Sequence, residues 1–162
     1  MSLVYKIIPS PVGELTLVAS DKGLTAILWE CDRETDRVRL GAMAEDADHP
    51  VLVEAARQIG EYFEGRRTAF DLPLDFRGTE FQKSVWAALL TIPFGETRSY
   101  AEIARAVGRP TAFRAVGAAN GRNPISIVAP CHRVVGSDGT LTGFAGGLEA
   151  KALLLGIEGR AG

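Results

Sequence analysis

The stretch from residue 127 to residue 135 contains the residue types best suited to covalent chemistry. Apolar residues surround Pro130-Cys131-His132-Arg133. This pattern predicts a buried strand that is apolar at both ends and carries reactive and polar side chains in its middle. A thiol is a useful nucleophile only as thiolate, which a neighbouring base or positive charge makes available near neutral pH. Taken alone, the Cys131-His132 pair still favours the plainer alternative, a buried cysteine that packs as a small apolar side chain.

Adjacency in the sequence limits how these two side chains can cooperate. Neighbouring side chains of an extended segment point to opposite faces, so His132 cannot easily bond the Cys131 sulfur directly. A bridging water, or a turn beginning at Cys131, would be needed. This spacing argues against a cysteine hydrolase, which would also need an oxyanion site and a second base. The other histidine, His49, lies in a predicted loop.

Length and composition are those of a soluble globular protein with a substantial core. The chain has 162 residues, of which 46% are apolar and 23% charged, enough for one large domain or two small ones. No apolar run approaches the length of a membrane span, and no signal segment is recognisable at the N-terminus. The two cysteines and two histidines form neither a disulfide framework nor a zinc spacing. We therefore expect a cytoplasmic protein without a metal.

Charge is distributed unevenly, although the formal net charge is only −2. Residues 30–80 contain 7 arginines and 13 acidic residues, a balance of −6. Residues 97–133 contain one acidic residue and six cations, a balance of +5; the cations are Arg98, Arg105, Arg109, Arg114, Arg122 and Arg133. Arginine suits bidentate phosphate contacts and stacking. Such a run is usually a solvated face, but its position beside Cys131 favours an anionic macromolecular partner.

The first third of the chain has the pattern of a small antiparallel sheet. Apolar runs separated by turn residues predict strands over residues 3–8, 14–20 and 24–29. Residues 31–49 are polar without periodicity and predict a loop, in which Cys31 is expected to be incidental. Pro50 then begins a helix with one apolar stripe. Gly65 ends this helix, and residues 68–74 predict a short strand.

The second half has the pattern of short, well-capped helices. Thr79 with Gln82 and Ser99 with Glu102 form two capping boxes, and a third helix is expected over residues 111–119. Two short helices across a three-residue turn are typical of a helix-turn-helix.

We therefore predict an α+β fold with two domains. The N-terminal domain, residues 1–76, contains a small antiparallel sheet and a helix. The C-terminal domain, residues 77–162, is mostly helical and contains the helix-turn-helix and the active-site strand.

The second helix of this helix-turn-helix has an unusual composition. Its only long polar side chain is Arg114, and its small residues are Ala112, Ala115, Gly117, Ala118 and Ala119. A helix of this kind could press close to a duplex over the narrow minor groove, where Arg114 would enter the base stack as a wedge. The alternative, equally compatible with these residues alone, is a plain turn between two helices with small packing residues.

Several ordered motifs in the second half resemble one known family. The active-site region of the O6-alkylguanine-DNA alkyltransferases is similar to Pro130-Cys131-His132-Arg133-Val134, with Asn123-Pro124 upstream and Gly146-Gly147 downstream. Their recognition helix resembles Arg114-Ala115-Val116-Gly117. The resemblance extends from about residue 78 to residue 158 and, more loosely, over the N-terminal half. It favours a nucleophilic Cys131 over a merely buried one.

The resemblance implies DNA repair by direct reversal of damage. The alkyl group on guanine O6, or thymine O4, passes to Cys131 in one displacement, and the resulting thioether is not turned over. The expected partner is double-stranded DNA containing O6-alkylguanine, bound through its minor groove by a monomer, and no cofactor is needed. The target base must leave the duplex, because the thiol cannot reach an atom inside the base stack.

Individual roles also follow from the resemblance. Cys131 is the nucleophile, His132 the base acting through water, and Glu158 the group that orients and charge-stabilises this histidine. Tyr100 is the proton donor to the guanine ring nitrogen, and Asn123 braces the turn before the active-site strand.

Further matches concern the DNA and the extruded base. Arg114 fills the gap that the base leaves, and other DNA contacts are expected from Arg109, Thr111, Ala115, Arg122 and Arg133. The substrate pocket is expected to contain Tyr100, Val134, Phe144 and Ala145, with backbone groups of Cys131, Val134 and Ala145 reading the base edge.

Two positions depart from the family pattern. Phe144 stands where a tyrosine is usual, so a phenolic hydroxyl near the alkylated oxygen is missing. Ala152-Leu153 stands where larger or charged residues are common, which implies altered packing of the last helix. Neither change removes the nucleophile.

Two alternatives come from other classes of protein. A non-reactive, alkyltransferase-like damage-recognition protein would keep the fold but lack the cysteine, so Cys131 argues against it. A helix-turn-helix regulator with a thiol sensor would need an effector or dimerisation segment, and none is visible in the sequence.

Overall fold

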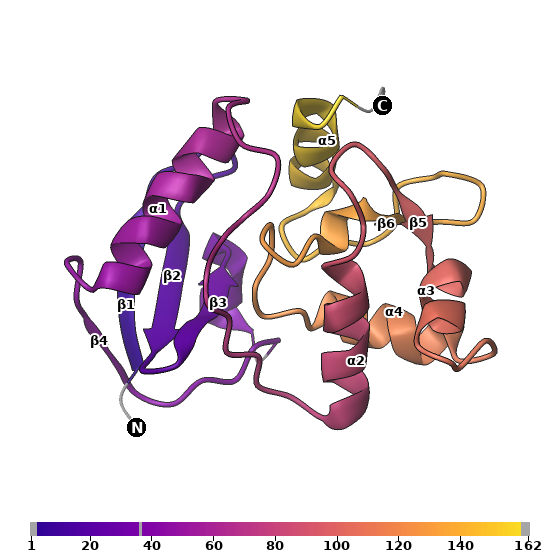
Figure 1. Cartoon of the computed structure of the whole chain (residues 1–162), viewed down its shortest axis with the longest axis horizontal. Coiled ribbons are helices and arrows are strands. Elements are labelled where there is room, and N and C mark those ends of the chain that lie inside the picture. The colour runs from indigo at the N-terminus through magenta and orange to yellow at the C-terminus, as the bar shows by residue number, and fades with distance from the viewer. Residues whose placement is uncertain (1–2, 36, 160–162) are drawn as a thin grey trace.

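The structure is a computed structural model that describes residues 3–35 and 37–159. Its N-terminal half is a four-stranded sheet with a helix against one face (Figure 1). The strands are β1 (Leu3–Ile8), β2 (Leu15–Ser20), β3 (Gly23–Leu28) and β4 (Met43–Glu45), in the order β3-β2-β1-β4. Helix α1 (Pro50–Phe63) begins with a proline, whose missing N–H costs nothing in a first turn. The apolar core between helix and sheet includes Leu15, Leu17, Ile27, Leu52 and Ile59.

Two predictions for this half are wrong in detail. The expected loop over residues 31–49 contains the end of a 3-10 helix, η1 (Glu30–Glu34), and strand β4, which pairs in parallel with β1. The sheet is therefore mixed, not purely antiparallel. All three residues of β4 are exposed, so no apolar alternation marks the strand in the sequence. The expected strand over residues 68–74 is irregular chain in which Leu74 forms one isolated bridge, with Leu24.

The second half is mostly helical, and the prediction of an α+β fold is confirmed. Its helices are α2 (Glu80–Leu89), α3 (Tyr100–Ala106), α4 (Phe113–Gly121) and α5 (Leu148–Ile157). Both capping boxes form as predicted: the Thr79 hydroxyl accepts from the Gln82 N–H, and the Ser99 hydroxyl from the Glu102 N–H, each at 3.1 Å. Helices α2, α3 and α4 enclose a second apolar core that includes Val85, Trp86, Ile103, Val116 and Cys131.

The segment around the cysteine is not the strand that we predicted. Ile127 has a φ of 76°, which turns the chain sharply. Cys131–Arg133 then forms a single 3-10 turn, η2, and only β6 (Val134–Val135) is a strand. Strand β6 pairs in parallel with β5 (Arg98–Ser99). The segment is made of turns, but it is buried and therefore apolar. Its composition thus resembles that of a buried strand, which explains the wrong prediction.

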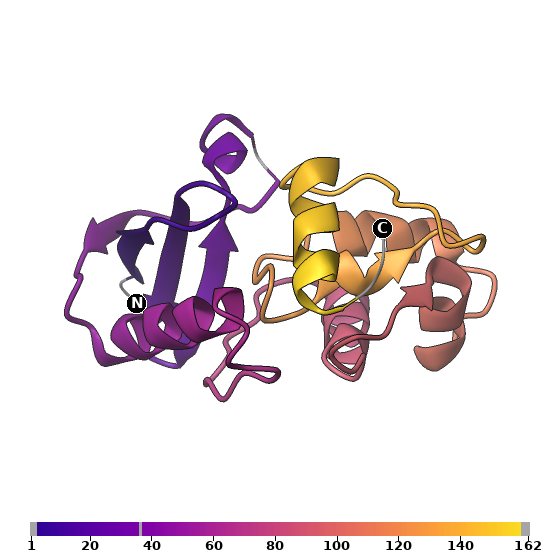
Figure 2. The same ribbon diagram turned by 90° about the horizontal axis from the view of Figure 1, so that it is seen from above.

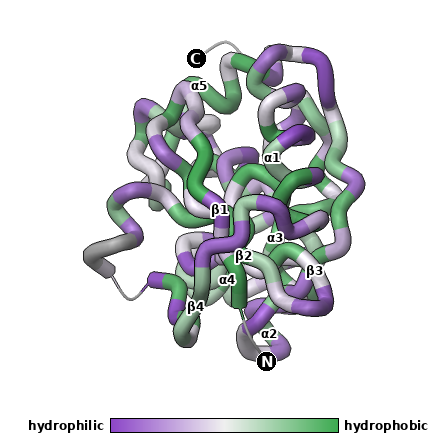
Figure 3. The backbone as a smooth tube through the Cα atoms, turned by 90° about the vertical axis from the view of Figure 1, so that its left-hand side faces the viewer, coloured by the Kyte–Doolittle hydropathy of each residue, from purple (hydrophilic) through white to green (hydrophobic). Residues whose placement is uncertain are grey.

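The two halves lie side by side, with α5 on the side of the second half that faces the first (Figures 1 and 2). The Ile27 N–H donates to the Pro124 carbonyl at 2.8 Å, and the Trp29 indole N–H donates to the Ser126 hydroxyl at 3.0 Å. These contacts join the end of β3 to the segment that leads into η2. Many outer turns are hydrophilic, and more of the hydrophobic stretches run inside (Figure 3).

Within the described residues, no helix is both long and apolar enough to cross a bilayer.

Candidate active site

Cys131 is the first residue of η2 and one of the buried residues of the second apolar core. Its side chain is almost completely buried, and its N–H donates to the Ala129 carbonyl at 2.8 Å. Burial raises the pKa of the Cys131 thiol, an effect that the polar side chains of Asn123 and Ser126 partly oppose. The resting group is therefore a thiol, and a base must remove its proton for it to react.

His132 follows Cys131 directly in the sequence and is the second residue of η2. The ring is completely buried, and its Nε2 lies 2.7 Å from Oε2 of Glu158. Burial lowers the pKa of His132, although the bond to Glu158 opposes the shift. The ring is thus neutral near neutral pH. Because a carboxylate can only accept, Nε2 carries the hydrogen, and Nδ1 has the free lone pair. Among the described residues, Nδ1 has no hydrogen-bond partner, so it is the nitrogen available to take a proton.

Glu158, just after α5, is the shared acceptor of the site. It accepts from the Tyr62 hydroxyl at 2.6 Å, from His132, and from Nε of Arg133 at 2.7 Å. Burial opposes ionisation, but the hydrogen bonds from His132 and Arg133 outweigh it and lower the pKa of Glu158 to about 2. A fixed carboxylate holds the His132 ring in one tautomer and orientation. Sequence reasoning missed Tyr62, because it lies on the apolar stripe of α1 like any core residue.

Arg133 requires a correction to the predicted DNA contacts. Its side chain is only 8% exposed, makes two bonds to Glu158, and donates to the Ile92 carbonyl at 2.6 Å. A guanidinium with these partners is an internal counter-ion to the carboxylate and does not face a duplex. The sequence did not distinguish this buried cation from the exposed arginines before it.

Asn123 spans the turn that precedes the cysteine. Its side-chain N–H donates to the Ala129 carbonyl at 2.8 Å, and its oxygen accepts from the Ile125 N–H at 3.1 Å. Both ends of a fully buried amide are therefore used to hold the backbone between residues 125 and 129. This geometry supports the bracing role that we expect of Asn123.

The four expected pocket residues come from three elements. Tyr100 begins α3, and its hydroxyl lies 2.6 Å from that of Thr142. Val134 begins β6 and is buried, while Phe144 and Ala145 belong to the loop before α5 and are partly buried. Lys151, which we did not predict, is buried and donates to the carbonyls of Val134 at 2.6 Å and Thr142 at 3.3 Å. It therefore ties the loop to β6.

The N-terminal half also holds this loop. The Trp29 ring meets that of Phe144 edge to face, with centroids 5.4 Å apart. A Cβ on Gly146 would lie 2.8 Å from the same indole, so only glycine fits there without a shift. Cys31 donates to the Ala145 carbonyl at 3.0 Å, and this thiol, which we expected to be incidental, thus lies against the loop of the predicted substrate pocket.

The other predicted DNA contacts are on the surface of the helix-turn-helix. Arg109 and Thr111 lie exposed in the turn between α3 and α4, and Arg114 and Ala115 lie exposed in the first turns of α4. The Arg109 guanidinium lies 5.8 Å from the centre of the Phe81 ring. Arg122 is exposed at the other end of α4. Exposed cations at both ends of one helix suit a polyanionic partner.

This fold and site define a class of protein: one that binds nucleic acid and carries its own nucleophile. The reason is that the helix-turn-helix can hold a duplex beside the buried thiol. The family follows from sequence models. Residues 3–76 match the ribonuclease-like domain of 6-O-methylguanine DNA methyltransferase, and residues 80–160 match its DNA binding domain. The chain belongs to this family.

Individual relatives are similar over almost their whole length. A methylated-DNA--protein-cysteine methyltransferase of Methanosarcina barkeri is 50% identical over 157 residues, covering 96% of this chain and 97% of the relative. One of Mycolicibacterium paratuberculosis is also 50% identical, with 96% and 92% covered. The crystal structure of Mycobacterium tuberculosis OGT in complex with DNA superposes with a TM-score of 0.86 at 47% identity, covering 96% of this chain and 92% of that one.

Proposed function

We propose that this protein repairs DNA by transferring the alkyl group of O6-alkylguanine to its own Cys131. The buried Cys131-His132 pair, with His132 fixed by Glu158, is the observation that carries the proposal. Relatives that are 50% identical bear the name methylated-DNA--protein-cysteine methyltransferase, which supports it. Cys131 also distinguishes this chain from a damage-recognition protein without a nucleophile.

In the transfer step, the Cys131 sulfur attacks the alkyl carbon. A C–S bond forms as the C–O6 bond breaks, and the electron pair of the broken bond returns to guanine. The thiol proton passes through one water to Nδ1 of His132, which later releases it to solvent. Tyr100 gives a proton to the guanine ring nitrogen and regains one from solvent, so that both side chains return to their starting state. The sum is unmodified guanine and S-alkylcysteine, so the step as written requires no metal or cofactor.

Each molecule acts once, because a thioether has no ready leaving group. O4-alkylthymine presents the same kind of carbon–oxygen bond and is the second substrate of this proposal. Asn123 keeps the cysteine turn in place, while Val134, Phe144 and Ala145 line the pocket of the extruded base.

DNA binding in this proposal is through α4, which lies in the minor groove of a duplex. Arg114 fills the space of the extruded base, and Arg109, Thr111, Ala115 and Arg122 contact the DNA around it. The protein acts as a monomer in the cytoplasm, a reducing compartment in which the Cys131 thiol stays free. The boundary between the two domains lies at about residue 76.

A stoichiometric transfer assay tests this function. The protein is mixed with excess duplex containing one radiolabelled O6-methylguanine, and protein-bound label is followed with time. We expect the label to reach one equivalent and then stop. Cys131→Ala should bind the duplex with nearly normal affinity and take up no label. Label accumulating beyond one equivalent, or undiminished in Cys131→Ala, would contradict the single-use mechanism.

A further inference from the structure

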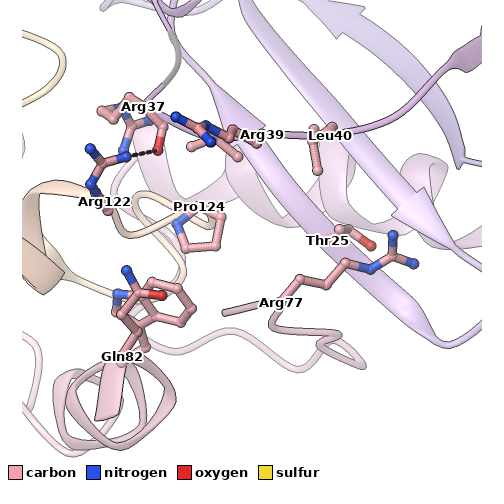
Figure 4. Close-up of a pocket in the computed structure, with 10 residues that line it drawn as sticks. Thr25, Arg37, Arg39, Leu40, Arg77, Gln82, Arg122 and Pro124 are labelled. Carbon is pink, nitrogen blue, oxygen red and sulfur yellow. Dashed lines mark hydrogen bonds between the residues drawn. The ribbon is translucent and has the colours of Figure 1, made fainter. Parts of the chain in front are cut away.

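A cavity of about 370 Å³ lies between the two halves, at the C-terminal end of α4 and apart from Cys131 (Figure 4). Its walls come from β3, from the segment after η1, from the segment before α2, from α2 itself, and from the residues that follow α4. The lining residues are Thr25, Arg37, Val38, Arg39, Leu40, Arg77, Gln82, Trp86, Arg122 and Pro124. Four of these ten are arginines and none is acidic. We call this cavity the arginine pocket.

Two of the four arginines have carboxylate partners outside the pocket. Arg37 is paired with Asp32 at 2.7 Å and donates to the carbonyls of Gly121 at 3.1 Å and Asn123 at 2.8 Å. Arg77 is paired with Asp75 at 3.3 Å. The Arg37 guanidinium also covers carbonyls at the C-terminal end of α4. The negative end of the helix dipole would otherwise repel an anion at this place.

The other two arginines carry positive charge that no carboxylate balances among the described residues. Arg39 is exposed, and its side chain makes no hydrogen bond or ion pair within the described part of the chain. Arg122 donates one long bond, of 3.4 Å, to the Arg37 carbonyl. Figure 4 shows Arg37 and Arg122 on one side of the pocket, Arg77 on the other, and Arg39 between them. An anion in this space would meet guanidinium groups from both halves of the protein.

Helix α2 adds a further favourable feature. Gln82 lies in the first turn of this ten-residue helix, where the dipole favours negative charge. Its oxygen accepts from the Thr79 N–H at 3.0 Å, so its amide N–H₂ is the end of the side chain that can donate to an anion. Trp86 and Pro124 supply an apolar wall, which limits competition from water.

We propose that the arginine pocket binds a backbone phosphate of the DNA duplex that α4 engages, so that the N-terminal half contributes directly to DNA affinity. The inference rests on the proposed function. Planar guanidinium groups match a phosphate bidentately, and Arg122 places the pocket at one end of the proposed recognition helix. A duplex carries one charge per ~1.7 Å of its axis, so a strand that leaves α4 at this end brings phosphates past the pocket.

A salt titration with matched variants tests the proposal. Duplex affinity is measured by fluorescence anisotropy over a range of salt concentrations for wild type, Arg39→Gln and Arg66→Gln. Arg66 is 61% exposed, lies just after α1 and does not line the pocket, so its variant loses the same charge elsewhere. We expect Arg39→Gln to weaken binding several-fold and to reduce the slope of log K against log[salt] by about 0.9, the value for one phosphate contact. Equal behaviour of the two variants would overturn the inference.

Neutral phosphate analogues identify the contact itself. Duplexes with a single methylphosphonate at successive positions are bound to wild type and to Arg39→Gln. One position should weaken wild-type binding more than it weakens Arg39→Gln binding, because the variant has already lost the contribution of Arg39 to that phosphate contact. The absence of such a position would contradict a direct phosphate contact.

Other occupants of the pocket give different results. If Arg39→Gln abolishes a tryptophan-fluorescence response to inorganic phosphate but leaves duplex affinity unchanged, the pocket binds free anions and the DNA assignment is wrong. If wild type self-associates and Arg39→Gln does not, with equal duplex affinities, the pocket binds the acidic surface of another copy and the assignment is again wrong. The proposed function is tested separately, by transfer of the radiolabelled methyl group to Cys131 of the wild type. If this transfer is normal and Arg39→Gln binds the duplex as Arg66→Gln does, only the present inference is overturned.

Discussion

At the scale of single residues, Glu158 connects the chemistry of the site to its stability. Its carboxylate accepts from Tyr62, His132 and Arg133, and its pKa is lowered to about 2 from an ordinary 4.5. A lowered carboxyl pKa stabilises the fold above the ordinary value, and this contribution is lost as the pH falls toward the folded value. The site is therefore expected to weaken between pH 4.5 and about 2.

The first prediction concerns Glu158→Gln. A neutral amide cannot titrate in this range, and it leaves the buried Arg133 charge without its partner. Urea unfolding should show the variant less stable than wild type at pH 7, by about 3 kcal/mol or more, with a smaller loss of stability as the pH falls below 4.5. Tyr62→Phe, which keeps the carboxylate and removes only the smallest of the contacts that lower the Glu158 pKa, should retain most of the wild-type pH dependence. A pH dependence in Glu158→Gln equal to that of wild type would show that this carboxylate is not the linked group.

The second prediction concerns Phe144, where the family usually has a tyrosine. A neutral hydrogen bond contributes about 0.5–1.5 kcal/mol, so a missing hydroxyl near the departing oxygen should slow transfer by roughly tenfold or less. Single-turnover measurements on O6-methylguanine duplex should show modestly faster transfer in Phe144→Tyr, with little change in DNA affinity. A rate that is unchanged or reduced would show that the hydroxyl is not what limits this site.

At the scale of elements, the loop before α5 depends on a contact with the N-terminal half. A Cβ on Gly146 would lie 2.8 Å from the Trp29 indole, whereas nothing lies within 4 Å of a Cβ on Gly143. Gly146→Ala must therefore move the loop or the ring, and Gly143→Ala need not.

The third prediction compares these two variants. A displacement of about 1 Å in a positioned site costs up to ~100-fold in rate, so single-turnover transfer should be at least several-fold slower in Gly146→Ala and near normal in Gly143→Ala. Both free O6-alkylguanine and duplex substrate should show the loss, because the pocket itself is altered. Equal rates in the two variants would exclude the Trp29 contact as a determinant of the pocket.

Local signals explain which elements the sequence could predict. The capping boxes of α2 and α3 need only residues three apart, and the three long strands and α1 need only local apolar patterns. The turn at Cys131 could not be predicted in this way. It depends on the side-chain bond of Asn123 to the Ala129 carbonyl and on the positive φ of Ile127, and neither can be inferred from apolar composition. Strand β4 is too short to show a period.

The same limit applies to the site. The local Pro-Cys-His-Arg pattern draws attention to Cys131, but the roles expected of Cys131, His132, Asn123 and Glu158 follow from the match of their positions to the family. Tyr62 is 96 residues from Glu158, and its role depends on how the two halves meet. Arg133 was misassigned because a buried and an exposed arginine look alike in sequence.

At the scale of the whole molecule, the proposed reaction needs a duplex held open beside the thiol. Arg114 is exposed on α4, whose inner face packs against α2 through Val116 and through the Trp86 indole, which donates to the Ala119 carbonyl at 2.8 Å. The helix is thus fixed to the core that also holds Cys131.

The fourth prediction concerns Arg114→Ala. If this side chain holds the extruded state, its loss should slow transfer from duplex far more than transfer from the free alkylated base. The ratio of the two single-turnover rates is the measurement. Arg105→Ala, which removes an exposed charge from α3, serves as the control. Equal losses on both substrates in Arg114→Ala would refute the wedge role.

The most direct test of the central claim is to locate the transferred group. Wild-type protein is incubated with duplex containing O6-methylguanine, digested, and sequenced by tandem mass spectrometry. The account predicts a single added methylene on the peptide containing Cys131, with the exposed Cys31 unmodified. Methylation of Cys31 with Cys131 unmodified, or no modification of either cysteine while the lesion disappears, would contradict it.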